Sequence, residues 1–173
     1  MSDRLFYKGM KGVLWKIAVL HFQCGRQIVN LIQVLVTGCD AGKRTALVNM
    51  LEEYGLEPMI ASNVEETRQV LGRRPMHVVF CEDKLPDGGF REILCLVKGS
   101  RPEIQVVLSS MLGDVHEYIE AMNLGAFDFI APPYRSTEIV SVIEGACRRY
   151  RLKRKDEGAL HDETEEWCKA ANP

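Results

Sequence analysis

The sequence predicts a single α/β domain in which helices cover both faces of a five-stranded parallel sheet. Between residues 32 and 150, short apolar runs alternate with amphipathic segments five times. The apolar runs are nearly continuous, which is typical of strands that are buried on both faces of a parallel sheet. Because crossovers between parallel strands are right-handed, five strands and five helices in alternation predict a doubly wound arrangement.

The five strands are predicted from β-branched, apolar runs that end at turn or helix signals. Gly38 stops the first run, and Pro132-Pro133 follows the last one. The predicted strands are Ile32–Thr37, Pro58–Ala61, His77–Cys81, Ile104–Leu108 and Phe127–Ile130.

Each of the five predicted helices has an apolar face, and we expect these faces to pack on the sheet. Asp40 is a candidate N-cap of the first helix, and Asn63 with Glu66 forms the capping pattern of the second. The positions that share a face are, helix by helix, Ala46, Leu47, Met50, Leu51 and Tyr54; Val64, Val70 and Leu71; Phe90, Ile93, Leu94 and Val97; Val115, Tyr118, Ile119 and Met122; and Ile139, Val140, Val142, Ile143 and Ala146.

Composition limits the class of protein. The 173 residues are 46% hydrophobic and 27% charged, which suits one globular domain with flanking segments. A net charge of −2 argues against a dedicated nucleic-acid binder, because such domains are clearly basic. The six cysteines show no CxxC pair and no metal-ligand spacing, so we expect free thiols in a reducing cytoplasm.

The predicted domain covers residues 32–152, and a basic, apolar segment of residues 1–31 precedes it. Val13–Phe22 is interrupted by Lys16 and is too short to span a membrane. We expect this segment to be a helix packed on the domain or an extension of the chain. A basic amphipathic helix that contacts a membrane or a partner through its aromatic residues is the alternative.

Residues 153–173 form a charged tail. The basic run Arg148–Lys155 ends the last predicted helix, where cations interact favourably with the helix dipole. The acidic residues Asp162, Glu163, Glu165 and Glu166 follow this run. Only 18 residues follow Lys155, so we expect no separate output domain in this chain.

The third predicted strand ends in an unusual acidic stretch. Glu82 and Asp83 follow the apolar run, and Pro86-Asp87-Gly88-Gly89 predicts a turn. In an open parallel sheet, ligand and chemical sites gather at the carboxyl ends of the strands. An acidic strand end that leads into a Leu-Pro loop therefore marks the candidate site.

Residues 32–150 resemble the receiver domain of two-component response regulators, which has a flavodoxin-like fold with strand order 2-1-3-4-5. The resemblance rests on the order of all ten elements and on the stretches Glu82-x-x-Leu85-Pro86, Ala121–Phe129 and Pro133-Tyr134. It implies a role in phosphorelay signal transduction, and a cis bond between Pro132 and Pro133. It also implies functional equivalents at Glu82 (phosphoacceptor), at Gly38, Cys39 and Asp40 (acidic pocket), at Ser109 and Phe129 (switch residues) and at Pro132 (lysine).

Three parts of the family's phosphoryl-transfer site, the metal clamp, the acceptor and the cation, are replaced at four of these positions. Gly38 and Cys39 replace an acidic pair that holds Mg²⁺, a hard cation that requires oxygen ligands. Glu82 replaces the phosphoacceptor Asp with one more methylene, so its carboxylate is expected to project further. Pro132 replaces the lysine and brings no charge. Phosphoryl transfer depends on positioning and charge neutralisation, so we expect no phosphoryl acceptance, no bound metal and no cofactor.

We therefore expect a phosphorylation-independent protein-interaction module and not an enzyme. Two interpretations of the pocket remain open: Glu82 stands in permanently for a charged acceptor, or the pocket has decayed. One alternative is a conventional receiver that is phosphorylated on Glu82 or Asp83. A more remote one is a nucleotide-binding P-loop at Gly38–Thr45, although its spacing is one residue short and Arg44 follows Lys43.

The resemblance also indicates where a partner binds. In receivers, the region that corresponds to Asp114–Tyr150 carries the output, usually by pairing with a second copy or with another protein. We expect a protein partner or a homodimer through this face, with Glu120 and Arg148 as complementary charges. We expect no nucleic-acid partner.

Overall fold

The computed structural model describes residues 31–111, 115–149 and 152, and it confirms the predicted fold class. The parallel five-stranded sheet has the order β2-β1-β3-β6-β7, which is the expected 2-1-3-4-5 order of a flavodoxin-like fold. Its strands are β1 (Val34–Thr37), β2 (Met59–Ala61), β3 (Val78–Glu82), β6 (Gln105–Ser109) and β7 (Asp128–Ile130).

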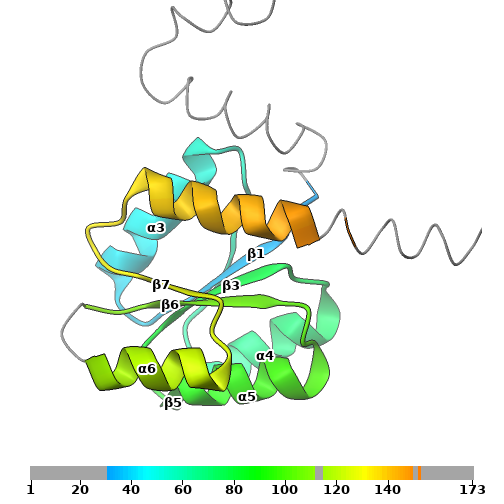
Figure 1. Ribbon diagram of the computed structural model, residues 1–173, viewed down its shortest axis with the longest axis vertical. Helices are drawn as coiled ribbons and strands as arrows, with labels where there is room; N and C mark the ends of the chain where they lie inside the picture. Colours follow the sequence, from blue (N-terminus) through cyan, green and yellow to red (C-terminus); the bar gives the residue numbers. More distant parts are fainter. Residues whose placement is uncertain (1–30, 112–114, 150–151, 153–173) are drawn as a thin grey trace, which may run out of the picture.

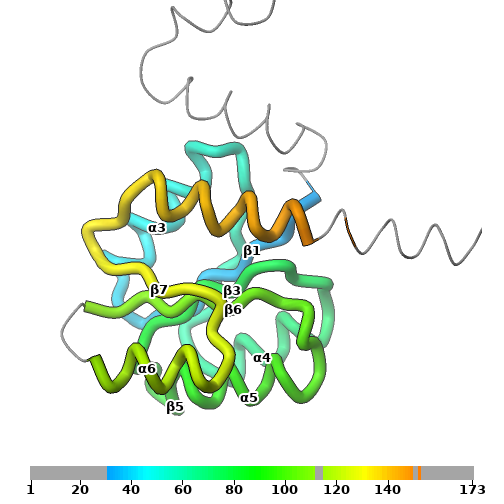
Figure 2. The backbone as a smooth tube through the Cα atoms, viewed as in Figure 1, coloured from blue at the N-terminus to red at the C-terminus, as the bar shows by residue number. Residues whose placement is uncertain are grey.

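Five helices cover the two faces of this sheet (Figure 1). One face carries α3 (Ala41–Glu53) and the last described helix, residues 136–149, drawn in orange. The other face carries α4 (Val64–Arg73), α5 (Phe90–Ser100) and α6 (Val115–Leu124). The backbone tube in Figure 2 shows the chain passing between these layers. The parallel strands therefore direct all their carboxyl ends to one edge of the sheet.

Each layer of helices encloses its own apolar core. Leu47 and Leu51 of α3 pack with Ile139 and Ile143 of the last helix against one face of the sheet. On the other face, α4 and α5 pack on the strands through buried side chains that include Leu71, Phe90, Ile93, Leu94 and Val97. Burying one such side chain contributes about 1.5–3 kcal/mol, so these two clusters hold the helices on the sheet.

The two predicted helix starts are confirmed. The Asp40 carboxylate accepts hydrogen bonds from the amides of Gly42 and Lys43, and it caps α3. The Asn63 side chain accepts from the amide of Glu66, while the Glu66 carboxylate accepts from the amide of Ser62. These bonds satisfy backbone donors that the first turn of a helix leaves unpaired.

Two predicted helix faces differ from the structure. Ala46 is exposed, and Val48 packs against the core in its place. In α6 only Ala121 is buried, whereas Val115, Tyr118 and Ile119 are 70%, 46% and 50% exposed. Periodicity shows which positions share a face, but it does not show whether that face meets the sheet. Here α6 packs through a small alanine and leaves its apolar face uncovered.

The turn predicted after β3 contains a small hairpin. Lys84–Leu85 (β4) and Gly88–Gly89 (β5) pair in antiparallel fashion around Pro86 and Asp87. A Cβ atom on Gly89 would lie 2.5 Å from the carbonyl oxygen of Asp83, so only glycine fits there. The Asp87 carboxylate accepts from the amides of Val64 at 2.7 Å and Glu65 at 3.0 Å, which ties this loop to the start of α4.

The expected cis peptide bond between Pro132 and Pro133 is confirmed. The basic apolar segment before residue 31 and the charged tail after residue 152 lie outside the described residues, as do Asp114 and Tyr150. Within the described part of the chain, no helix has the length and apolar character needed to cross a membrane.

Candidate functional site

The structure brings the residues predicted for the pocket to one edge of the sheet. Gly38, Cys39 and Asp40 follow β1, which lies beside β3 with Thr37 opposite Cys81. Glu82 ends β3, and its register partner on β6 is Ser109. Three strand ends therefore meet around the Glu82 side chain.

The Glu82 carboxylate turns back toward the loop after β1. Glu82 is only 5% exposed, and its Oε2 atom accepts hydrogen bonds from the amides of Cys39 at 3.0 Å and Asp40 at 3.2 Å. These amides precede α3, where free backbone donors and the helix dipole favour negative charge. The Glu82 side chain thus reaches the amides of the loop after β1, which hold its carboxylate inside the protein.

Gly38 provides the space that the Glu82 carboxylate occupies. A Cβ atom on Gly38 would lie 2.7 Å from both Cδ and Oε1 of Glu82, closer than real Cβ contacts allow. The two positions are therefore matched, since any side chain at 38 would displace Glu82 from the amides it binds. The sequence showed a missing acidic ligand at 38, but it carried no sign that glycine is needed for packing.

Cys39 adds a weak donor to the same carboxylate. Its Sγ atom lies 3.6 Å from Glu82 Oε2 and 3.6 Å from the carbonyl oxygen of Lys84. Partial burial, and then the nearby Glu82 charge, raise the pKa of the Cys39 thiol above its ordinary value. The thiol is therefore protonated at neutral pH, whereas metal binding and nucleophilic chemistry require the thiolate.

The residues present do not fit the Mg²⁺ ion that a phosphate-accepting site of this kind uses. Asp40 is the remaining acidic side chain of the loop, and its Oδ1 atom is occupied by the amides of Gly42 and Lys43. These bonds, that of Lys43 first, lower the pKa of the Asp40 carboxyl. Within the described residues, no group of three or more His, Cys, Asp or Glu side chains is placed to hold a metal ion.

The same hydrogen bonds bear on the P-loop alternative. A phosphate-binding loop presents free backbone amides to its ligand. Here the amides of Cys39 and Asp40 bind Glu82, and those of Gly42 and Lys43 bind Asp40. In addition, Arg44 donates to the carbonyl oxygen of Gly38 at 2.7 Å. The protein's own carboxylates occupy the donors that a phosphate would need.

The two switch-equivalent residues have different partners. Ser109 is 2% exposed, and its Oγ atom lies 2.8 Å from the hydroxyl of Tyr134. Burial raises the pKa of Tyr134, and the Glu82 charge raises it further. Phe129 instead meets Tyr118 of α6 edge to face, with ring centroids 5.7 Å apart. Sequence reasoning gave no role to Tyr134, although its place beside Pro133 was a signal.

Pro132, at the lysine-equivalent position, is separated from the end of β7 by Ala131 and brings no charge to the site. The structure thus places an internal carboxylate, a buried serine bonded to a partly buried tyrosine, and an uncharged proline where strand ends converge. This arrangement, on a five-stranded flavodoxin-like sheet, is that of a receiver-type domain with an altered pocket.

The response regulator receiver domain model matches residues 34–144, and the chain belongs to this family. Over 130 residues it is 25% identical to a putative NtrX-like response regulator of Rickettsia bellii, covering 74% of this chain and 27% of that protein. It is also 25% identical over 129 residues to the transcriptional regulatory protein FixJ of Bradyrhizobium diazoefficiens, covering 75% and 63% of the two chains.

Solved structures agree with this assignment. NtrX from Brucella abortus, in complex with ADP, aligns with a TM-score of 0.65 and 26% identity over 73% of this chain and 28% of that one. A response regulator receiver domain protein from Clostridium thermocellum aligns with a TM-score of 0.64 and 26% identity, covering 70% and 98%. The chain spans about a quarter of the length of its NtrX-like relatives. It is a receiver domain of the two-component response regulators, a class of signalling module.

Proposed function

We propose that this receiver domain is a protein-interaction module that works without phosphorylation, with Glu82 as a permanent internal acid. The observation that carries the proposal is the matched pair of Gly38 and Glu82. Because Gly38 has no side chain, the Glu82 carboxylate lies in the space that a Cβ atom at 38 would enter. The two backbone bonds from Cys39 and Asp40 further support a site built around this carboxylate.

Phosphorylation of Glu82 is disfavoured by the same geometry. Its Oε2 atom is held by two amides, and its Oε1 atom is buried without a hydrogen-bond partner among the described residues. An attack on phosphorus would have to break the bonds to Oε2 or expose Oε1. Phosphoryl transfer relies on a metal and a cation, whereas no described group of His, Cys, Asp or Glu is placed to hold a metal and Pro132 stands at the lysine-equivalent position.

We propose that the partner binds to the apolar face of α6, defined by Val115, Tyr118, Ile119 and Met122. These side chains are 70%, 46%, 50% and 38% exposed, on one helix. Groups of exposed apolar residues typically mark protein interaction sites. This face lies within the predicted Asp114–Tyr150 region, and the partner is another protein or a second copy of the chain.

Apolar contact, rather than the expected charge pair, supports this interaction. Glu120 already forms a two-pronged ion pair with Arg91 of α5, so it is not free to meet Arg148 of another copy. That pair lowers the pKa of Glu120 through the Arg91 hydrogen bonds. We also propose a cytoplasmic location, with which the free thiols of Cys39, Cys81, Cys95 and Cys147 agree.

Incubation with acetyl phosphate and Mg²⁺, followed by intact-mass measurement, tests the proposal. We expect no phosphoryl adduct on the parent protein. The matched control carries Gly38→Asp, Cys39→Asp, Glu82→Asp and Pro132→Lys together, which restores the metal ligands, acceptor and cation. An adduct on this variant alone supports the proposal, whereas a stoichiometric adduct on the parent overturns it.

A further inference from the structure

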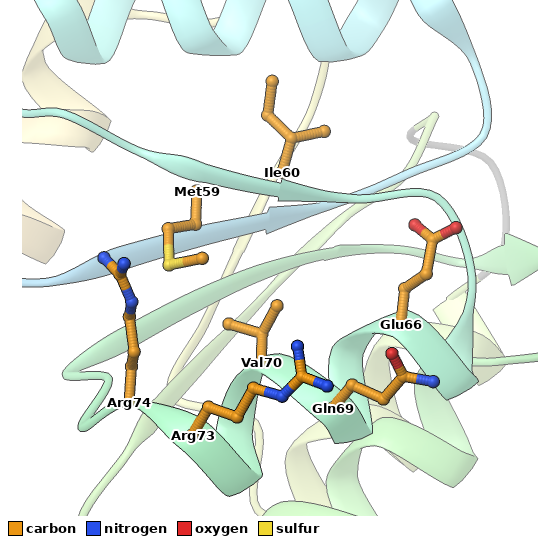
Figure 3. A pocket seen from close by; sticks show the side chains of 7 residues that line it. All are labelled: Met59, Ile60, Glu66, Gln69, Val70, Arg73 and Arg74. Atoms are coloured by element: carbon orange, nitrogen blue, oxygen red, sulfur yellow. The ribbon is translucent and has the colours of Figure 1, made fainter.

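A groove lies between the edge strand β2 and helix α4, away from the Glu82 site and from the apolar face of α6. It encloses about 290 Å³. Figure 3 shows Arg74 at one end and Glu66 at the other, with Met59 and Val70 between them. The residues that line it are Met59, Ile60, Glu66, Gln69, Val70, Arg73 and Arg74.

The groove follows an open edge of the sheet. In the described part of the chain, β2 pairs with β1 only, so its outer side faces no strand. Met59 and Ile60 leave β2 in opposite directions (Figure 3), and Ile60 is 50% exposed. An open strand edge with apolar side chains on both sides is a template for an added strand.

The free charge in this groove is positive. Glu66 is engaged at the start of α4, where its carboxylate accepts from the Ser62 amide at 2.7 Å and the Asn63 side chain at 3.1 Å. Arg73 and Arg74 are exposed and, within the described residues, their side chains form no ion pair or hydrogen bond. The groove therefore combines an apolar centre with two guanidinium groups that have no protein partner there.

We propose that this groove binds an extended peptide segment of a protein partner, with acidic and apolar side chains, as an added strand along β2. An apolar side chain of the segment would lie over Met59 and Val70, and carboxylates would lie beside Arg73 and Arg74. Guanidinium groups suit this role because they bind carboxylates with two parallel hydrogen bonds. The chain's own acidic residues 162–166 are a poorer match, because the basic run Arg148–Lys155 is closer to them along the chain.

Fluorescence anisotropy with the full chain tests this proposal. The probe is a labelled peptide in which glutamate and valine lie on the same face of an extended strand, with threonine at every second position, and the counterpart with lysine in place of glutamate is the charge control. We expect the acidic peptide alone to bind, and its affinity to fall as salt is raised. Replacing both arginines, as Arg73→Glu with Arg74→Glu, should weaken binding by about tenfold, since two exposed ion pairs are lost. Arg68→Glu, on the same helix but outside the groove, should leave affinity unchanged.

Two further measurements distinguish strand addition from simple charge attraction and from occupation of the groove by the chain's own tail. A probe with methylated backbone amides keeps its charges but cannot donate to β2, so its binding should be lost. Retained binding of that probe, or equal affinity of the parent and the double arginine variant, overturns the proposal. A full chain with Glu165→Lys and Glu166→Lys should bind the probe as the parent does. A severalfold gain in that variant would show that the groove belongs to the chain's own tail instead.

Discussion

The Glu82 site and the apolar face of α6 differ in their contacts: polar groups at the site are hydrogen-bonded within the protein, whereas apolar side chains on α6 are exposed to solvent. At the site, the loop amides, Oε2 of Glu82 and the Ser109 hydroxyl have hydrogen-bond partners inside the protein, while the buried Oε1 of Glu82 has none among the described residues. On the α6 face, Val115 and Ile119 are 70% and 50% exposed, although Tyr118 meets the ring of Phe129. The proposed function therefore makes separate predictions for these two regions, one for the pocket around Glu82 and one for the exposed face of α6.

The largest effect is expected when a substitution displaces the Glu82 side chain, and this tests whether the hydrogen bonds at the site stabilise the protein. Gly38→Ala places a methyl group 2.7 Å from the Glu82 carboxylate and should separate that group from the Cys39 and Asp40 amides. We expect a loss of about 1–3 kcal/mol in the free energy of unfolding, the range for unpairing buried polar groups. Urea denaturation measures this loss.

A double-mutant cycle shows whether the loss comes from Glu82. In a Glu82→Asp background the side chain is shorter, so Gly38→Ala should cost little. Gly72→Ala is the matched control, because Gly72 lies in α4 with no atom within 4 Å of an added Cβ. That variant should be neutral or stabilising, since alanine favours helix. Equal losses from Gly38→Ala in both backgrounds would contradict the matched pair.

The open surface gives the second prediction. Ile119→Asp places a charge on the apolar face of α6, and we expect association with the partner or second copy to weaken by about tenfold or more. Folding stability should change by less than about 0.5 kcal/mol, because Ile119 is 50% exposed. Sedimentation equilibrium measures self-association, and thermal unfolding measures stability.

Ile60 supplies a control of the same residue type and the same 50% exposure, on the edge strand β2. Ile60→Asp should leave association through α6 unchanged. If Ile60→Asp weakens self-association while Ile119→Asp does not, the copies meet at β2. If neither variant changes it, the α6 face is not the contact surface.

The sequence predicted the fold better than the site for a physical reason. Strand and helix order depends on local periodicity, which a linear sequence displays. The fit of Glu82 over Gly38 depends on the close approach of the end of β3 and the loop after β1, at positions 44 residues apart in the chain. The outward direction of Ile119 depends on Ala121 being the residue that packs. Neither of these facts is visible until the elements are placed together.

A third prediction concerns the hydrogen bond between Ser109 and Tyr134, which was also hidden by sequence separation. Tyr134→Phe removes one partner and leaves the buried Ser109 hydroxyl unpaired, so we expect a loss of about 1 kcal/mol. Adding Ser109→Ala removes the second partner and should recover part of this loss. Denaturant titration of the three variants measures the coupling, and strictly additive losses would argue against the bond.

The smallest expected effect concerns the loop between β3 and α5, which is hydrogen-bonded to the start of α4. Asp87 accepts from the amides of Val64 and Glu65, and these bonds, that of Val64 first, lower the pKa of its carboxyl. Because the folded pKa lies below the unfolded one, the contribution to stability is present at neutral pH. It is lost as the pH falls through the folded pKa.

Asp87→Asn should therefore lower the melting temperature by a few degrees at pH 7, and the difference from the parent should shrink in acid. Asn63→Ala is the matched control, because Asn63 caps the same helix through the amide of Glu66 but does not titrate. The drop in melting temperature caused by Asn63→Ala should be the same at neutral and acid pH, unlike the drop caused by Asp87→Asn. Thermal unfolding across this pH range gives both comparisons. A constant difference between Asp87→Asn and the parent from neutral to acid pH would show that the Asp87 charge does not hold the loop on α4.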